Sequence, residues 1–193
     1  SATTRAAPPT FRDLPRMNFP RSRPAFAFAS STLAAFLALA AITPLRAQEP
    51  RLANVSTLTR VGTGADVLTA SFVISGTTPK QVVIRAVGPR LATEPFNVVN
   101  TLADPTLTVF GPNSSTTVAA SNDNWNSSDP ATAAAFASVG AFALTAGSRD
   151  AAVVTTLAPG SYSAQVSGVG GTTGMAIIEV YEAGATAGKF VNL

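Results

Sequence analysis

The densest group of potential ligand atoms lies between residues 121 and 129, where the sequence reads Ser-Asn-Asp-Asn-Trp-Asn-Ser-Ser-Asp. Calcium binds roughly 6–8 oxygen atoms, and loops rich in Asp and Asn supply them. The pattern suggests a calcium site built on the carboxylates of Asp104, Asp123 and Asp129. The side-chain amides available to a bound ligand are those of Asn122, Asn124 and Asn126.

A structural role explains the same loop. Asn and Asp are common in tight turns and at helix N-caps, and Asp129 precedes Pro130 and an alanine-rich run. The spacing also lacks the glycine and the terminal glutamate of an EF-hand. We favour the structural interpretation and keep the calcium site as a hypothesis.

Trp125 is the single tryptophan and lies within this loop. An aromatic face on a loop can stack on a sugar ring, so a glycan is the second candidate ligand. The alternative is that the indole closes the open end of a hydrophobic core, because large aromatic side chains are usually buried.

The chain contains no His and no Cys. These absences exclude Ser-His-Asp triads, cysteine nucleophiles, zinc sites with imidazole or thiolate ligands, and disulfides. Glu179 and Glu182 are the closest pair of glutamates, but an offset of three places them on opposite faces of a strand. The glycines of residues 168–174 do not match a phosphate-binding loop. We therefore predict that the protein is not an enzyme.

Two further polar residues lie where strands are expected. Arg85 either faces solvent or forms a buried ion pair with an acid such as Asp104 or Glu179. Tyr162 follows a Pro-Gly-Ser turn, a position where the ring usually packs on the core and the hydroxyl bonds nearby backbone.

Alternating apolar and polar residues, separated by Gly, Pro and Asn turns, predict about eight short strands. The expected strands are Leu52–Leu58, Asp66–Ser75, Gln81–Val87, Thr106–Phe110, Thr116–Ser121, Ala151–Leu157, Tyr162–Ser167 and Met175–Tyr181. Only Pro130–Ser138 favours a helix. The pattern predicts an all-β fold, an antiparallel β-sandwich or jelly roll with one short helix.

The basic residues are concentrated at one end of the chain. Residues 1–47 carry six arginines and one aspartate, a charge of +5, whereas the rest carries seven basic and nine acidic residues, a charge of −2. The overall charge of +3 and pI near 10.0 therefore do not indicate a nucleic-acid partner.

Residues 17–47 have the pattern of a signal peptide, with a positive start at Met17, an apolar stretch over 25–42 and the small or medium residues Leu45 and Ala47 before Gln48. An uncleaved membrane anchor is the alternative. Residues 1–16 form a non-native or upstream extension, and residues 48–183 form the β-sandwich domain. We expect a secreted or cell-surface protein that meets the membrane only through the signal segment during export.

Two short segments repeat the same pattern. Residues 51–55 read Arg-Leu-Ala-Asn-Val and residues 189–193 read Lys-Phe-Val-Asn-Leu, with the latter following a glycine-containing linker that begins at residue 184. The second segment is a last edge strand of the same sheet, the start of a further repeat, or a strand exchanged with a neighbouring copy. The predicted assembly residues are Lys189, Phe190, Val191, Asn192 and Leu193.

Several segments resemble a module that recurs, often in tandem, in large secreted and surface proteins of environmental bacteria. They are Arg-Leu-Ala-Asn-Val-Ser-Thr from Arg51, Ile-Arg-Ala-Val-Gly-Pro from Ile84, Ala-Asp-Pro-Thr-Leu from Ala103, Ser-Asn-Asp-Asn-Trp from Ser121, Leu-Ala-Pro-Gly-Ser-Tyr from Leu157 and Gly-Met-Ala-Ile-Ile-Glu-Val-Tyr from Gly174. The second half, about 104–181, is also similar to the bacterial pre-peptidase C-terminal domain. The resemblance implies an accessory, non-catalytic, extracellular β module.

Two functions follow as expectations. The first is a structural or adhesive module of an exported surface or matrix protein, which contacts neighbouring repeats or identical subunits through its terminal strands. The second is an accessory module that binds calcium or a glycan through the 122–129 loop. Calcium is the only cofactor considered.

Overall fold

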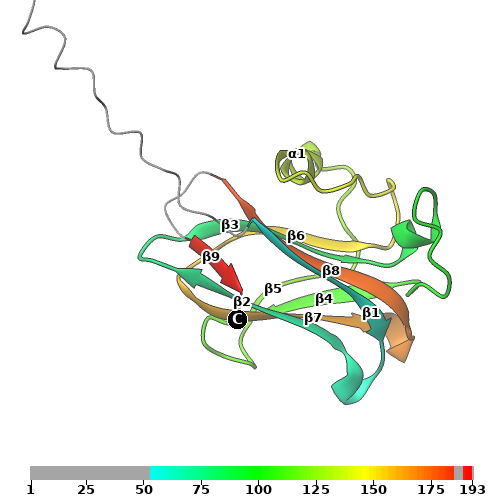
Figure 1. The fold of residues 1–193 in the computed structure, drawn as a ribbon, viewed down its shortest axis with the longest axis horizontal. Helices are drawn as coiled ribbons and strands as arrows, with labels where there is room; N and C mark the ends of the chain where they lie inside the picture. Colours follow the sequence, from blue (N-terminus) through cyan, green and yellow to red (C-terminus); the bar gives the residue numbers. More distant parts are fainter. Residues whose placement is uncertain (1–52, 185–188, 193) are drawn as a thin grey trace, which may run out of the picture. The chain divides into compact units, whose positions relative to one another are not determined.

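The computed structural model describes residues 53–184 and 189–192. Two antiparallel sheets pack face to face, which confirms the predicted all-β sandwich with one short helix (Figure 1). Predictions about the upstream extension and the signal peptide fall on residues outside the described part. No helix among the described residues has the length and apolar character needed to cross a membrane.

Nine strands form the two sheets in the described part of the chain. The four-stranded sheet has the order β1 (Asn54–Val61), β8 (Gly174–Ala183), β3 (Lys80–Val87) and β6 (Ala151–Leu157). The five-stranded sheet has the order β5 (Val118–Asn122), β4 (Pro105–Phe110), β7 (Gly160–Gly168), β2 (Leu68–Ser75) and β9 (Lys189–Asn192). The remaining elements are α1 (Pro130–Ser138) and the short 3-10 helices η1 (Gly64–Asp66), η2 (Pro89–Ala92) and η3 (Val169–Gly171).

Most strand boundaries differ from the predicted ones by one to three residues, and two of the differences have a clear physical reason. β1 extends to Val61 because this side chain is fully buried in the core. β5 begins later than predicted because the Ser114 hydroxyl accepts hydrogen bonds from the backbone N–H groups of Thr116 and Thr117, which holds these residues in a turn.

The main core lies between the sheets and follows the predicted alternation. In β2, Leu68, Ala70, Phe72 and Ile74 point inward and are buried. The alternate residues of the five-stranded sheet point away from the core and are largely polar. We call this surface the polar sheet face; its residues include Thr69, Ser71, Thr108, Ser163 and Gln165.

In the four-stranded sheet β3 and most of β8 are buried on both faces, whereas most residues of the edge strand β1 are exposed. Residues of β3 alternate between the main core, reached by Val82 and Ile84, and a second apolar cluster, reached by Val83 and Val87. The helix α1 and the loops on either side of it supply the other side of this cluster. Burial on both faces explains why β3 reads as a nearly continuous apolar run.

Leu102 fixes the loop that enters β4. Its backbone N–H donates to the carbonyl of Met175 at 2.8 Å, and its side chain is fully buried. The backbone of Gly88 comes so close that a Cβ there would lie 2.1 Å from the Leu102 carbonyl oxygen. Only glycine fits this position, so the loop and the end of β3 pack in direct backbone contact.

Candidate functional site

Arg85 lies in a fully buried ion pair on the α1 side of the four-stranded sheet. Its register partner is Glu179 of β8, and its Nε and Nη2 donate to Glu179 Oε2 at 2.9 and 2.5 Å. The structure therefore confirms the buried-partner alternative with Glu179 and excludes a solvent-facing Arg85. Asp104 is paired elsewhere.

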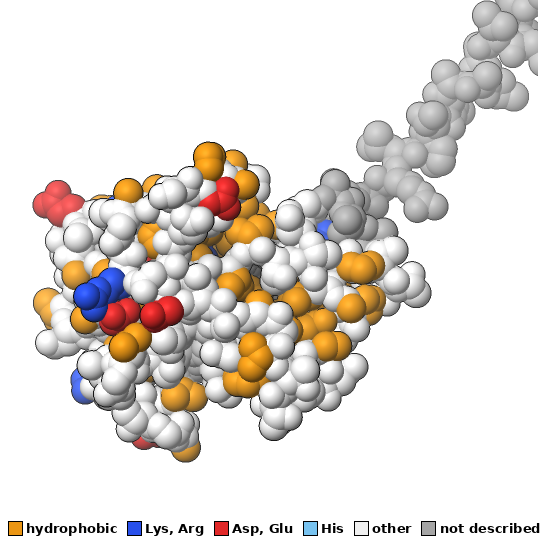
Figure 2. Space-filling model, turned by 180° about the vertical axis from the view of Figure 1, so that it is seen from behind, with side chains coloured by type: hydrophobic (Ala, Val, Ile, Leu, Met, Phe, Trp, Pro, Cys, Tyr) orange, Lys and Arg blue, Asp and Glu red, His pale blue; other side chains and the backbone are white. Residues whose placement is uncertain are grey.

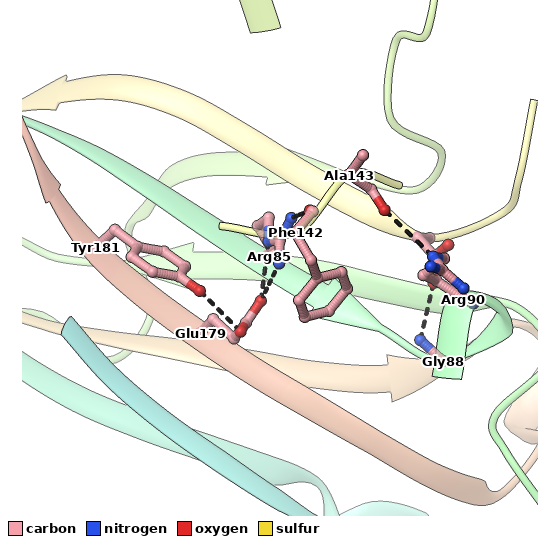
Figure 3. A network of polar contacts seen from close by, with 8 residues as sticks. Arg85, Gly88, Arg90, Phe142, Ala143, Glu179 and Tyr181 are labelled. Atoms are coloured by element: carbon pink, nitrogen blue, oxygen red, sulfur yellow. Dashed lines mark hydrogen bonds and ion pairs between the residues drawn. The ribbon is translucent and has the colours of Figure 1, made fainter. Parts of the chain in front are cut away.

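Aromatic rings and a backbone carbonyl complete the surroundings of this pair (Figure 3). The guanidinium carbon of Arg85 lies 4.3 Å from the centre of the Phe142 ring and 5.1 Å from that of Phe136. Arg85 Nη1 also donates to the Phe142 carbonyl at 2.5 Å. The arginine thus joins the sheet to the loop that covers it.

The Tyr181 hydroxyl donates to Glu179 Oε1 at 2.8 Å (Figure 3). Burial, together with the negative charge of Glu179, raises the pKa of Tyr181 to about 12. The hydroxyl consequently stays protonated at neutral pH and keeps donating this hydrogen bond. Both carboxylate oxygens are occupied and Glu179 is only 4% exposed, so the group is placed to hold strands together rather than to meet a substrate.

Asp150 is a second buried carboxylate, which the sequence analysis missed. Its Oδ1 accepts hydrogen bonds from the backbone N–H groups of Gly88 and Arg90 at 2.9 and 3.2 Å, and its Oδ2 accepts from the Ser148 hydroxyl at 2.6 Å. The only available signal was an acid directly before a predicted strand, which is also typical of an exposed turn.

Arg90 adds further contacts between the loop after β3 and the loop before β6. Its Nε donates to the Ala143 carbonyl at 3.2 Å (Figure 3). Its Nη1 donates to the Glu94 carbonyl at 2.6 Å. Its guanidinium carbon also lies 5.3 Å from the centre of the Phe96 ring. Together with Asp150, this side chain fixes both loops that cover the sheet.

The other predicted glutamate, Glu182, forms an ion pair with the fully buried Lys80. Lys80 Nζ also donates to the Gly184 carbonyl at 3.3 Å. Glu179 and Glu182 therefore lie on opposite faces of β8, as their three-residue offset predicts.

The three predicted calcium carboxylates have separate roles. Asp104 Oδ2 pairs with Arg149 Nη1 at 2.7 Å, whereas Asp123 Oδ2 accepts only the side-chain amide of Asn124, at 3.3 Å. Among the described residues, no group of three or more acidic side chains is placed to hold a metal. The three carboxylates each have other partners in the fold, and the calcium site stays a prediction.

Asp129 caps the N-terminus of α1. Its Oδ1 accepts from the N–H of Ala131 at 3.0 Å and its Oδ2 from the hydroxyl of Thr132 at 2.8 Å. These bonds, with Thr132 first, lower the pKa of Asp129. The structural interpretation of this residue is confirmed.

The loop amides are also used within the fold. Asn122 Oδ1 accepts from the N–H of Ala152 at 3.0 Å and its Nδ2 donates to the Asn124 carbonyl at 3.0 Å. Asn126 Oδ1 accepts from the N–H of Ser128 at 3.0 Å. These contacts shape the loop and leave no converging set of amides.

Trp125 is only 8% exposed, and its ring packs 5.7 Å from the Phe136 ring. Its Nε1 donates to the Thr145 carbonyl at 3.2 Å and to Ser148 Oγ at 3.1 Å. The indole borders a small apolar cavity of about 110 Å³ beside α1. A sugar-stacking role requires an exposed ring, so this placement contradicts it; the ring closes the second apolar cluster rather than the end of the main core.

Tyr162 occupies the predicted structural position. Its hydroxyl donates to the Ala158 carbonyl at 2.8 Å, and its ring stacks on Phe72 with centres 5.5 Å apart. The predicted assembly segment forms β9, which pairs with β2 at the edge of the five-stranded sheet (Figure 1). This is the edge-strand arrangement among the three alternatives. Leu193 lies outside the described residues.

Comparison with known proteins gives resemblances to solved structures. No family model matches the chain, and no curated protein matches it. A solved structure of the pre-peptidase C-terminal domain of a collagenase from Bacillus anthracis is similar, with a TM-score of 0.38 and 12% sequence identity. The match covers 69% of this chain and 99% of that one.

Proposed function

We propose that the protein is a non-catalytic structural or adhesive β-sandwich module of an exported surface or matrix protein, and that it assembles through its terminal strands. The observation that carries this proposal is that β9 pairs with the edge of β2 within the single chain, so this edge accepts an added extended strand. Strand addition to a sheet edge is a common means of protein association, because it uses backbone hydrogen bonds.

The buried charges support a structural role. Arg85 and Glu179 join β3 to β8, and Asp150 joins β6 to the loop after β3. Buried ion pairs of this kind hold elements in a defined arrangement, whereas a catalytic carboxylate needs access to a substrate.

The outer surface supports contact with neutral material rather than with a polyanion. The polar sheet face carries hydroxyl and amide side chains. Figure 2 shows few charged side chains on the face that it displays, and most of them lie toward one side. A nucleic-acid partner would require a basic surface.

Export rests on the signal-peptide pattern of residues 17–47. We expect the full chain, expressed in a bacterium, to appear outside the cytoplasm with Gln48 at its N-terminus, as measured by mass spectrometry. Protein that keeps residues 17–47 and stays in the cytoplasm would refute export.

Thermal unfolding of the full chain separates the structural proposal from the ligand-binding alternative. A ligand at a hundred times its Kd stabilises a protein by about 2.7 kcal/mol, which raises the Tm by several degrees. We expect the same Tm in millimolar calcium, in chelator and with soluble neutral glycans. A reproducible rise with calcium or a glycan would favour the accessory binding module.

A further inference from the structure

The strand β9 shares a sequence pattern with residues 51–55, of which the structure places Asn54 and Val55 in β1. An offset of 138 residues relates 189–193 to 51–55. Asn192 is the last residue of β9, and its equivalent, Asn54, is the first residue of β1. The asparagine of the shared pattern is thus the last residue that pairs with β2 in one segment and the first residue of β1 that pairs with β8 in the other.

We propose that residues 51–54 of one copy pair with β2 of a second copy, in the place that β9 takes in the single chain. The proposal rests on the structural function above and identifies the partner as a second copy of this chain. Because Val191 pairs with Val73 and Asn192 with Phe72, the offset places Ala53 of one copy opposite Val73 of the other.

The start of β1 has a free side for such a contact. Ala53 and Asn54 are exposed, and the Ala53 carbonyl accepts a hydrogen bond from the Glu182 N–H at 2.9 Å. In the described part of the chain β1 is the edge strand of its sheet, with β8 on one side only. A strand has two hydrogen-bonding edges, so this segment can pair with its own β8 and with β2 of a second copy.

The donor segment and the acceptor edge are different surfaces, so the contact is heterologous. Such contacts join copies head to tail and build chains rather than closed dimers. In a single chain β9 competes for the same edge at an effective concentration of about millimolar. The contact between copies is therefore expected when Lys189–Asn192 is displaced or removed.

Disulfide trapping tests the proposed register, because the chain has no cysteine of its own. The test protein ends at residue 188 and carries Ala53→Cys and Val73→Cys. Under mild oxidation we expect a ladder of disulfide-linked oligomers on a non-reducing gel. Restoring residues 189–193 should suppress the ladder at least fivefold, because β9 then covers the edge.

The matched control moves the donor cysteine two residues along the strand, as Val55→Cys with Val73→Cys. This shift is about 7 Å, beyond the reach of a disulfide. A ladder that forms equally from both pairs, or from neither in a folded chain, overturns the proposal. The near-ultraviolet signal of the buried Trp125 reports whether the shortened chain is folded.

A second variant keeps the chain at full length, so that a folding failure of the shortened chain does not decide the matter. Residues 189–193 take the sequence of 51–55 through K189R, F190L, V191A and L193V. If the segments are interchangeable, amide hydrogen exchange at Phe72–Ser75 stays within about threefold of the native chain. If the exchange protection at these residues falls to the level of the shortened chain, the proposal is overturned. The structural function is tested separately, by the thermal unfolding experiment with calcium and glycans.

Discussion

The Arg85–Glu179 pair gives the sharpest quantitative prediction. Replacing Arg85 by Met removes a fully buried cation and leaves the Glu179 carboxylate among aromatic rings without its counter-ion. Removing one partner of a buried pair costs about 3–5 kcal/mol, because the remaining charge is desolvated and unpaired. We therefore expect R85M to lose about 3–5 kcal/mol in the free energy of unfolding.

A half-exposed ion pair provides the comparison. Arg149 pairs with Asp104 at 2.7 Å, and the Arg149 side chain is 68% exposed whereas that of Asp104 is 15% exposed. Water already solvates the guanidinium, so the pair contributes less than one in which both charges are buried. R149M should therefore lose less stability than R85M, although it removes the same type of side chain.

A double variant separates unpaired charge from lost packing. In R85M with Glu179→Met, no charge remains, and hydrophobic replacement of a whole buried pair is often nearly neutral. The Tyr181 hydroxyl then lacks its acceptor, which leaves a residual loss of about 1–3 kcal/mol. The double variant should therefore be more stable than R85M alone.

Urea unfolding followed by tryptophan fluorescence measures all three proteins. The single tryptophan, Trp125, packs in the same apolar cluster as the covering loop, so its emission reports loss of this region. With a slope of about 1–3 kcal/mol per molar urea, R85M should shift the midpoint by at least 1 M. A loss below 1 kcal/mol in R85M, or a double variant less stable than R85M, would refute the structural role of the pair.

The remaining predictions concern pH, the helix cap and backbone contacts. The pKa of Tyr181 is raised to about 12, so the hydrogen bond of its protonated hydroxyl contributes fully to stability below pH 10 and is lost as the pH rises to 12. The urea midpoints of the native protein and Y181F should therefore converge between pH 10 and pH 12. Because the pKa of Asp129 is lowered, D129A should reduce the Tm at pH 7 more than D123A, and the difference should shrink below pH 4. D150A should cost about 3 kcal/mol and D150N less, measured by urea unfolding, because the amide keeps an acceptor for the loop N–H groups. G88A should yield little folded protein by circular dichroism, since its Cβ would overlap the Leu102 carbonyl; native-like folding would contradict the backbone contact.

The alternation of apolar residues made the sheets predictable. In β2 every second residue points into the core, so a period of two was visible without tertiary information. The helix α1 was equally visible, because Asp129 and Pro130 precede an alanine-rich run and the cap forms as expected.

The polar clusters were only partly predictable, because they depend on contacts between residues far apart in the chain. Arg85 and Glu179 are register partners on adjacent strands. The alternation of residues along each strand could suggest this pair, but it could not show whether the pair is buried. Asp150 gave no distinctive signal because its partners are backbone N–H groups, which every sequence contains. The carboxylates of the calcium hypothesis illustrate the same point: oxygen-rich composition does not show whether the oxygens converge, and Asp104, Asp123 and Asp129 have different partners.

The two sheets differ in how they contribute to stability and to contacts with other molecules. In the four-stranded sheet β3 and β8 are covered on both faces, and the side chains of Arg85 and Asp150 fix the covering loops, so the exposed edge strand β1 is the part left to meet a partner. The five-stranded sheet has one face in the core, one polar face outside, and an edge completed by β9. Backbone groups at an edge accept any extended segment of suitable register, whereas a fixed polar pocket accepts one ligand. A fold with a buried charge network and a sheet edge that accepts an added strand is therefore suited to contacts between copies through backbone pairing.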